Sequence, residues 1–124
     1  APAPAAAAPA SAPAAGTYSG DATYYTPGLG ACEATNTASD HIAALNSPQF
    51  GNWARYLNSP FCVNTCALVK GPKGQVKVKI VDRCPECKRG DLDLSPAAFD
   101  LIADAAKGRV EISWSWTSCD GVKA

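Results

Sequence analysis

The segment 81–99 constrains the fold of this chain more than any other part of its sequence. It joins the end of an alternating strand to a Cys-x-x-Cys corner at Cys84 and Cys87, then to carboxylates at Asp91 and Asp93, and finally to a Ser-Pro dipeptide. Serine caps the first turn of helices, and proline is tolerated at the first helical position. Few architectures place a strand end, a corner, a carboxylate pair and a helix start within nineteen residues.

The rest of the chain has the pattern of a small β-rich domain. Val76, Val78 and Ile80 alternate with lysines, which indicates a strand with one apolar face. The same period places Asp82 on the apolar side at the strand's end, where a carboxylate caps a turn or lines a cleft. Strands are expected at 21–25, 40–45, 66–70, 75–81 and 110–116, and short helical segments at 47–56 and 95–107. This pattern predicts a small closed barrel of about six strands.

Composition narrows the class of protein. The first sixteen residues are almost entirely alanine and proline, so we expect a disordered tail at 1–16 and one globular domain at 17–124. Eleven basic and eleven acidic residues cancel, which argues against nucleic acid as a partner. No apolar run is long enough to span a membrane. The absence of methionine fits a secreted protein that has lost its signal peptide.

Six cysteines in so short a chain predict three disulfides and an oxidising, extracellular location. One alternative is a zinc site, because Cys62-x3-Cys66 and Cys84-x2-Cys87 could supply four thiolates. That arrangement would leave two cysteines over. A redox role for the Cys-x-x-Cys pair is disfavoured, since no βαβ pattern precedes it. We therefore expect neither a metal nor a cofactor.

Asp93 is the first candidate for chemistry. It lies between Leu92 and Leu94, and apolar neighbours raise the pKa of a carboxyl group toward that of a usable acid. The alternative is a structural carboxylate that caps a turn or pairs with a nearby basic side chain. Asp40 and His41 are weaker candidates for groove-facing groups.

The segment 81–99 closely resembles the signature of expansin-like and rare lipoprotein A-like proteins. The run 90–96, Gly-Asp-Leu-Asp-Leu-Ser-Pro, matches their Gly-x-Leu-Asp-Leu-Ser-Pro motif, whose aspartate is the key acid and falls on Asp93. With no second domain, the chain resembles the small secreted fungal loosenins, which are single-domain relatives of expansins. The resemblance implies a mainly β fold, a six-stranded double-psi β-barrel with one or two short helices, stapled by disulfides.

The resemblance also assigns further residues. Asp82 matches the aspartate that closes the preceding strand, and Thr23 with Tyr25 match an Ala-Thr-aromatic-Tyr motif. This makes Asp93, Asp82 and Thr23 the candidate catalytic residues, with the Thr23 hydroxyl donating to Asp93. Tyr24 and Tyr25 of this motif are candidate substrate-binding residues. Two more candidates come from the sequence itself: Asp40 as a groove-facing carboxylate, and Trp53, whose Gly-Asn-Trp context favours an exposed ring on which a sugar can stack. The chain departs from the bacterial pattern at Cys84, which stands where bacterial expansins have an aromatic residue after the aspartate. It departs from plant expansins at Leu92, which stands where they have phenylalanine before the acid.

By analogy with the family's four-cysteine pattern, Cys32 pairs with Cys62 and Cys84 with Cys87. This leaves Cys66 with Cys119.

The function implied is that of a secreted monomer that binds and loosens cell-wall polysaccharide, cellulose or chitin or both, without net hydrolysis. Two alternatives stay open. A glycan-cleaving enzyme, of the endoglucanase or lytic transglycosylase kind, would need a base, for which Asp82, Asp40, Asp21 or Asp91 are available. The other alternative is a protein-binding protease inhibitor or effector, in which Asp93 would have no role.

Overall fold

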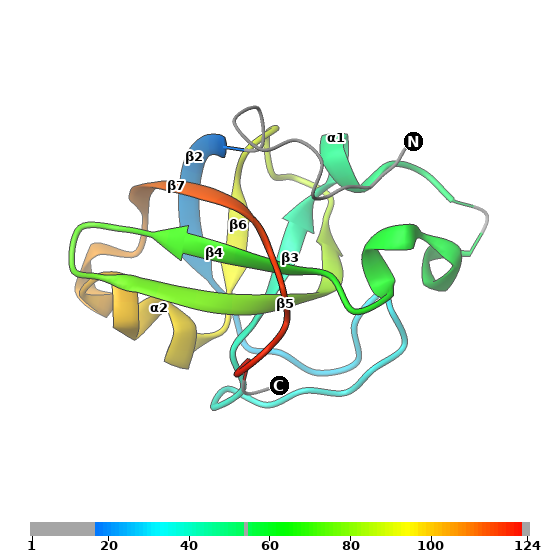
Figure 1. Cartoon of the computed structure of the whole chain (residues 1–124), viewed down its shortest axis with the longest axis horizontal. Helices are drawn as coiled ribbons and strands as arrows, with labels where there is room; N and C mark the ends of the chain where they lie inside the picture. Colours follow the sequence, from blue (N-terminus) through cyan, green and yellow to red (C-terminus); the bar gives the residue numbers. More distant parts are fainter. Residues whose placement is uncertain (1–16, 54, 123–124) are drawn as a thin grey trace.

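The structure is a computed structural model that describes residues 17–53 and 55–122. In this part of the chain six strands close a barrel in the order β2-β6-β3-β5-β4-β7 (Figure 1). The strands are β2 (Thr17–Tyr24), β3 (Ile42–Asn46), β4 (Cys66–Lys70), β5 (Gln75–Cys84), β6 (Leu92–Leu94) and β7 (Val110–Thr117). The mainly β, six-stranded barrel expected from the sequence is confirmed. The tail predicted at 1–16 lies outside the described residues.

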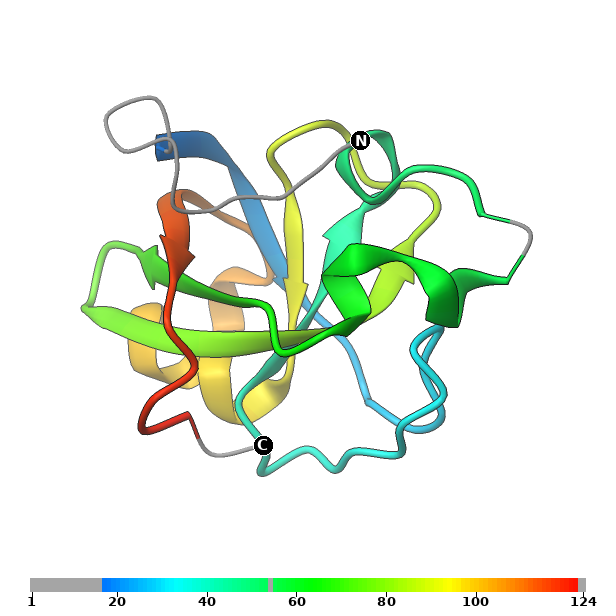
Figure 2. The same ribbon diagram turned by 45° about the vertical axis from the view of Figure 1, so that its right-hand side comes forward.

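Short helices lie at the ends of the barrel rather than around it (Figure 2). They are α1 (Ser47–Phe50), η2 (Tyr56–Asn58), η3 (Pro60–Cys62), α2 (Pro96–Ile102) and η4 (Ala105–Lys107). The helix α2 begins where the Ser-Pro signal predicts, because the Ser95 side chain accepts a hydrogen bond from the Ala98 N–H. It packs against β5 and β2.

Two helical predictions were wrong in their limits. The first helix is capped by Asn46, whose side chain accepts from the Gln49 N–H, and it ends at Phe50 because Gly51 has a φ of 86°. The second does not run to Lys107. Its backbone becomes extended at Ala103, and a separate 3₁₀ turn, η4, follows.

The register of the strands brings both candidate aspartates beside β3. In the parallel pair β3–β5, Ala43 pairs with Ile80 and Ala44 with Asp82, so that Val81 is an extra residue at a bulge. The bulge reverses the side-chain alternation of β5. The expectation that Asp82 continues the apolar face was therefore wrong, because Asp82 shares the outward face with Ala44.

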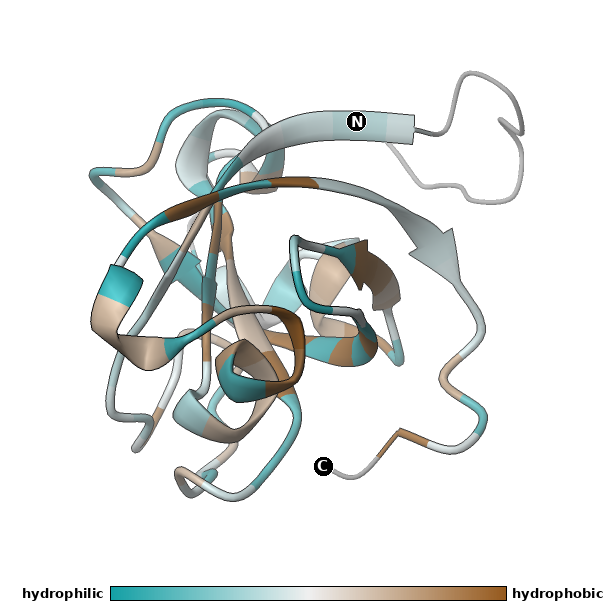
Figure 3. Cartoon of the chain, turned by 90° about the vertical axis from the view of Figure 1, so that its left-hand side faces the viewer, coloured by the Kyte–Doolittle hydropathy of each residue, from teal (hydrophilic) through white to brown (hydrophobic). Residues whose placement is uncertain are grey.

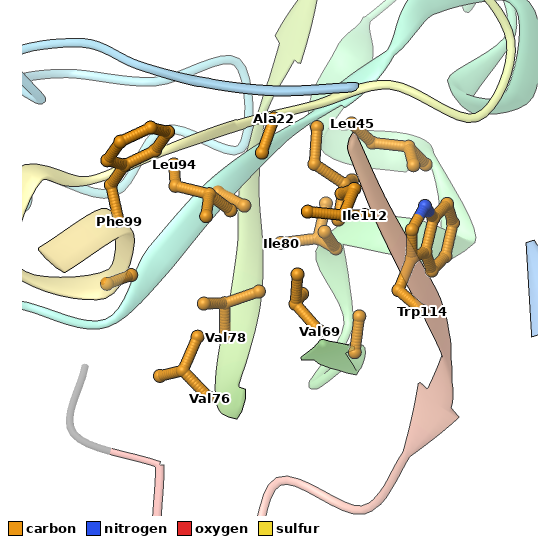
Figure 4. Packing of buried hydrophobic residues seen from close by; sticks show 14 of the residues in the cluster. Ala22, Leu45, Val69, Val76, Val78, Ile80, Leu94, Phe99, Ile112 and Trp114 are labelled. Atoms are coloured by element: carbon orange, nitrogen blue, oxygen red, sulfur yellow. The ribbon is translucent and has the colours of Figure 1, made fainter. Parts of the chain in front are cut away.

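The core fills the interior of the barrel (Figure 4). Leu92 and Leu94 are fully buried in it, which leaves Asp93 between them pointing outward. Trp114 is also buried, and its indole N–H donates to the Gly90 carbonyl at 2.8 Å. The core thus fixes both the strand that carries Asp93 and the turn before it.

Three disulfides link Cys32 to Cys62, Cys66 to Cys119 and Cys84 to Cys87, as expected. All six cysteines are therefore bonded to sulfur, and the alternative zinc site loses its thiolates. Among the helices that the structure describes, none has both the length and the apolar character needed to cross a membrane.

Candidate functional site

Asp93 lies at the centre of β6, a strand of three residues between β2 and β3. Its parallel partner on β2 is Thr23, and its antiparallel partner on β3 is Ala44. The Thr23 hydroxyl donates to one oxygen of the Asp93 carboxylate at 2.8 Å. The hydrogen bond expected between these two side chains is thus present, and within residues 17–53 and 55–122 no hydrogen bond is made to the second carboxylate oxygen of Asp93.

The surroundings of Asp93 favour its protonated form. Burial, first of all, raises the pKa of Asp93, and the negative charges of Glu86 and Asp82 raise it further. The hydrogen bond from Thr23 and the charge of Arg109 act in the opposite direction. Since the raising effects win, Asp93 holds its proton to a higher pH than an ordinary aspartate. This is the property that a general acid needs.

Tyr25 continues this group of side chains just beyond the end of β2. Its backbone N–H donates to the Leu94 carbonyl at 3.0 Å, so the pairing of β2 with β6 continues for one residue beyond the end of β2. Burial, and then the negative charges of Asp82 and Asp93, raise the pKa of the Tyr25 hydroxyl. The phenol therefore stays protonated and can donate a hydrogen bond to a carboxylate or to a ligand. Thr23, Tyr25, Asp82 and Asp93 are thus brought together, as the family motif implies.

Asp82 has a structural task within this group. One of its carboxylate oxygens accepts from the Ala31 N–H and from the Arg83 N–H, each at 2.8 Å. The loop around Gly30 packs closely on it, because a Cβ at Gly30 would lie 2.5 Å from the Val81 carbonyl. Asp82 thus anchors the loop that follows β2, and its charge acts on Asp93 and Tyr25 from the side.

A cleft of about 260 Å³ opens in front of Asp93. Its acidic side chains are Asp21, Glu86, Asp91 and Asp93, and Thr23, Arg109 and the Cys84–Cys87 disulfide complete the walls. Asp91 is hydrogen-bonded to the backbone, since its two carboxylate oxygens accept from the N–H groups of Asp21 and Lys88. Arg109 forms an ion pair with Asp21 at 3.1 Å.

Glu86 and Arg109 are the cleft residues that were missed from the sequence. Glu86 lies inside the Cys-x-x-Cys corner, so its place beside Asp93 depends on the turn that the disulfide closes. Arg109 directly precedes β7 and reaches the cleft because β7 pairs with β2. The corner next to the acid was a signal for Glu86. Nothing in the local sequence pointed to Arg109.

The remaining candidates lie in other settings. Tyr24 donates from its hydroxyl to the Ala105 carbonyl and packs its ring on Phe99, at the end of the barrel that carries η4. Trp53 is half-buried, and its indole N–H donates to the Phe50 carbonyl. Neither residue lines the cleft in front of Asp93. Their role as sugar contacts stays a prediction.

Asp40 and His41 precede β3. The Asp40 carboxylate accepts from the Thr37 N–H and the Asn36 side chain, which is the geometry of a turn cap. His41 is half-buried, and its carbonyl accepts from the Lys79 N–H. Both lie before the strand whose middle, Ala44, faces Asp93. Their part in the site is likewise a prediction.

A family model described as lytic transglycolase, a double-psi β-barrel family, matches residues 17–114. The chain belongs to this family. As an expansin-like double-psi β-barrel protein, it is 48% identical over 46 residues to the expansin YoaJ of Bacillus subtilis, a match that spans 37% of the chain and 20% of that protein. It is 34% identical over 99 residues to the papain inhibitor of Streptomyces mobaraensis, covering 78% of the chain and 69% of the inhibitor.

The similar solved structures are likewise a papain inhibitor and an expansin. The Streptomyces papain inhibitor superimposes with a TM-score of 0.76 at 31% identity, covering 83% of the chain and 96% of the inhibitor. A mutant expansin of Clavibacter michiganensis in complex with cellohexaose superimposes with a TM-score of 0.68 at 30% identity. That match covers 82% of the chain but 50% of the expansin. The expansin-like chain therefore spans about half of this relative and a fifth of YoaJ.

Proposed function

We propose that this protein binds cell-wall polysaccharide, cellulose or chitin or both, and loosens it without net hydrolysis. The observation that carries the proposal is the state of Asp93. It is an acid whose pKa is raised, mainly by burial; it is fixed by the Thr23 hydroxyl at 2.8 Å and placed at an open cleft of about 260 Å³. Such a group can donate a hydrogen bond or a proton to a glycosidic oxygen, and so weaken the contacts of one glycan chain with its neighbours.

The absence of net hydrolysis rests on what surrounds the acid. Glycoside hydrolysis needs a second carboxylate that is free to act as base or nucleophile. Asp82 and Asp91 accept hydrogen bonds from backbone N–H groups, and Asp21 is paired with Arg109. Glu86 is the remaining acidic side chain of the cleft, and it lies on the exposed corner closed by Cys84 and Cys87. These engagements leave Glu86 as the one cleft carboxylate with no bonded partner among the described residues, and we propose that on its exposed corner it raises the pKa of Asp93 rather than serving as the base for hydrolysis.

Kinship supports the polysaccharide assignment. Two of the similar proteins are expansins, and one of them was solved with cellohexaose. Three disulfides suit an extracellular protein. We therefore propose that it acts outside the cell. We further propose that it acts as a monomer and, because of its likeness to loosenins, that it comes from a fungus.

The test is retention on cellulose, chitin, xyloglucan and peptidoglycan, with product analysis of each supernatant and a measurement of wall extension. We expect retention on cellulose or chitin, faster extension under load, and no new reducing ends. Reducing ends or anhydro-sugars released in proportion to protein would replace the proposal with glycan cleavage. A protein retained on none of the four polymers would remove it altogether.

A second candidate is inhibition of a papain-like protease. It is favoured by length, because the chain covers nearly the whole papain inhibitor but only half of the Clavibacter expansin. Titration of papain with this protein distinguishes the two candidates. Stoichiometric inhibition that is unchanged in Asp93→Asn would favour the inhibitor, whereas the polysaccharide proposal expects papain to stay fully active.

A further inference from the structure

A second hollow borders the cleft in front of Asp93 on the outside of the barrel. This groove, about 640 Å³ in volume, lies over β2, β7 and the end of β4. Asp21 lines both the cleft and the groove. Figure 3 shows β2 and β7 running side by side across this part of the surface. The two hollows therefore adjoin at Asp21, and together they extend over four neighbouring strands, from β6 to β4.

Two serine hydroxyls line the groove, with two carboxylates and one ammonium group beside them. Ser19 on β2 pairs with Ser113 on β7, which pairs in turn with Lys70 on β4. Two residues further along β2, on the same face of the sheet, Asp21 pairs with Glu111 of β7. Serine hydroxyls both donate and accept hydrogen bonds, and their small size lets a flat ligand approach the sheet.

The barrel itself limits what can bind there. Along the groove β2 pairs with β7, and Lys70 of β4 lies between Ser113 of β7 and Gln75 of β5. The other edge of β2 is covered by the turn before β6, because a Cβ at Gly20 would lie 2.3 Å from the Gly90 carbonyl and the Asp21 N–H donates to the Asp91 carboxylate. This part of β2 therefore leaves no room for an extended peptide to be added as a further strand. Recognition must come from side chains, and hydroxyl, amine and carboxylate groups complement a neutral molecule that carries many hydroxyls.

We propose that this groove is an accessory binding site for a neutral β-linked glycan whose chain also passes Asp93. The inference rests on the proposed function and adds to it a direction and a length. From Asp93 on β6 to Lys70 on β4 the path crosses three interstrand spacings, about 14 Å, and shifts by four residues along β2, about 13 Å, so its ends lie roughly 19 Å apart. This is long enough for a short oligosaccharide rather than for one sugar ring. Longer oligosaccharides should therefore bind more tightly than short ones.

The test compares the wild-type protein with Ser19→Val/Ser113→Val in binding cellobiose and cellohexaose. Valine favours β-strands, so the variant should fold while losing two hydroxyl partners. We expect the affinity for cellohexaose to fall roughly tenfold, the size of two neutral hydrogen bonds, with little change for cellobiose. Ser115→Val is the matched control, because Ser115 lies on the same face of β7 but outside the groove. It should bind as the wild type does.

Amide shifts of the labelled wild-type protein separate the two proposals. Shifts at Thr23 and Asp93 together with Ser19 and Ser113 on adding cellohexaose support the groove. Shifts in the cleft alone, or equal affinities of double variant and wild type, overturn the groove and leave the proposed function standing. No shift with either cellohexaose or chitohexaose overturns both. If the double variant does not fold, Ser113→Ala with the same ligands decides the question.

Discussion

At the scale of single residues, the candidate chemistry depends on the balance between the neighbours that raise the pKa of Asp93 and those that lower it. Asp93 has buried leucines on either side in sequence, a hydroxyl donor on one side of the sheet and other carboxylates near it. The hydrogen bond from Thr23 favours the charged form, while burial and negative neighbours disfavour it. Because the two sets of effects come from different residues, they can be removed one at a time.

Asp93→Asn keeps the shape of the side chain and an oxygen that can accept from Thr23, but removes the titrating proton. Wall extension should fall at least about tenfold, which is a lower bound, since a general acid typically contributes about a hundredfold or more. Retention on polysaccharide should change little, since the cleft and groove keep their other polar groups. Extension assays run beside pull-downs check this. Unchanged extension by the folded variant would remove the role of Asp93, and Asp100→Asn on the exposed face of α2 is the control.

The raised pKa of Asp93 also makes the free energy of unfolding depend on pH. The folded protein binds this proton more tightly than the unfolded chain, so the contribution is fully present below the unfolded pKa of about 4. It is lost as the pH rises toward the raised pKa of the folded state. Above that window Asp93→Asn should be at least as stable as the wild type, and below it the difference should vanish. Denaturant unfolding at several pH values measures this, and a variant that is less stable at neutral pH would contradict it.

Glu86→Gln removes one of the negative charges that hold the proton on Asp93. The pKa of Asp93 should fall, and the pH above which wall extension declines should move to a lower value. Carboxyl-carbon NMR titration of Asp93 measures the pKa directly. The effect should be absent in Asp100→Asn, which removes a charge away from the cleft. An unchanged titration of Asp93 in Glu86→Gln would show that the corner does not act on the acid.

At the scale of elements, the site depends on one close crossing between β2 and the turn that precedes β6. Gly90 has a φ of 92°, and a Cβ there would lie 2.1 Å from the Ser19 carbonyl. Gly20 meets the same turn from the other side, with its Cβ position 2.3 Å from the Gly90 carbonyl. Only glycines allow these two segments to touch. This contact sets Thr23 and Asp93 level with each other.

Gly90→Ala should therefore destabilise the fold by about 2 kcal/mol or more, because strain and a clash with backbone act together. Chemical denaturation gives the change in unfolding free energy. Gly28→Ala is the control, since a Cβ at Gly28 would meet no atom within 4 Å and its φ is not positive. Equal stabilities of the two variants would mean that the crossing can relax at little cost.

Elements were predictable from the sequence where local chemistry decided them. The alternation that marks β5, the Ser-Pro cap of α2 and the β7 strand follow from local pattern. β2 is longer than expected, starting at Thr17 rather than 21, because its pairing with β7 extends it. The outward turn of Asp82 depends on a bulge that no local signal announces. The acid and its threonine came from the family motif, whereas Glu86 and Arg109 reach the cleft only through a closed disulfide and a closed barrel.

At the scale of the whole molecule, disulfides hold the barrel and the cleft to different degrees. Cys66–Cys119 joins positions 53 residues apart and ties β4 to the segment after β7. Cys84–Cys87 joins positions only three apart and forms a wall of the cleft. The long bridge should matter for folding stability, and the short one for the geometry of the site.

Replacing Cys66 and Cys119 by alanine should lower the unfolding free energy by about 4 kcal/mol in the chain-entropy model. Replacing Cys84 and Cys87 should lower it by about half as much, yet reduce wall extension more, because Glu86 loses its fixed position. Unfolding curves and extension assays on both variants check the order. The reverse order, with the short bridge dominating stability, would contradict this division.

The order of the strands also decides when the site can exist during synthesis. The first strand that the structure describes, β2, pairs with β6 and β7, and the hydrogen bond from Thr23 to Asp93 spans 70 residues of chain. As the polypeptide leaves the ribosome, β2 has no partner until almost all of the domain has emerged. Contacts of such long range make folding slow, and they expose the early strand to wrong partners in the meantime. The acid and its threonine can therefore meet only after most of the domain has been made, and a chain cut short before β6 keeps Thr23 and Glu86 but lacks Asp93 and the strand that closes the cleft.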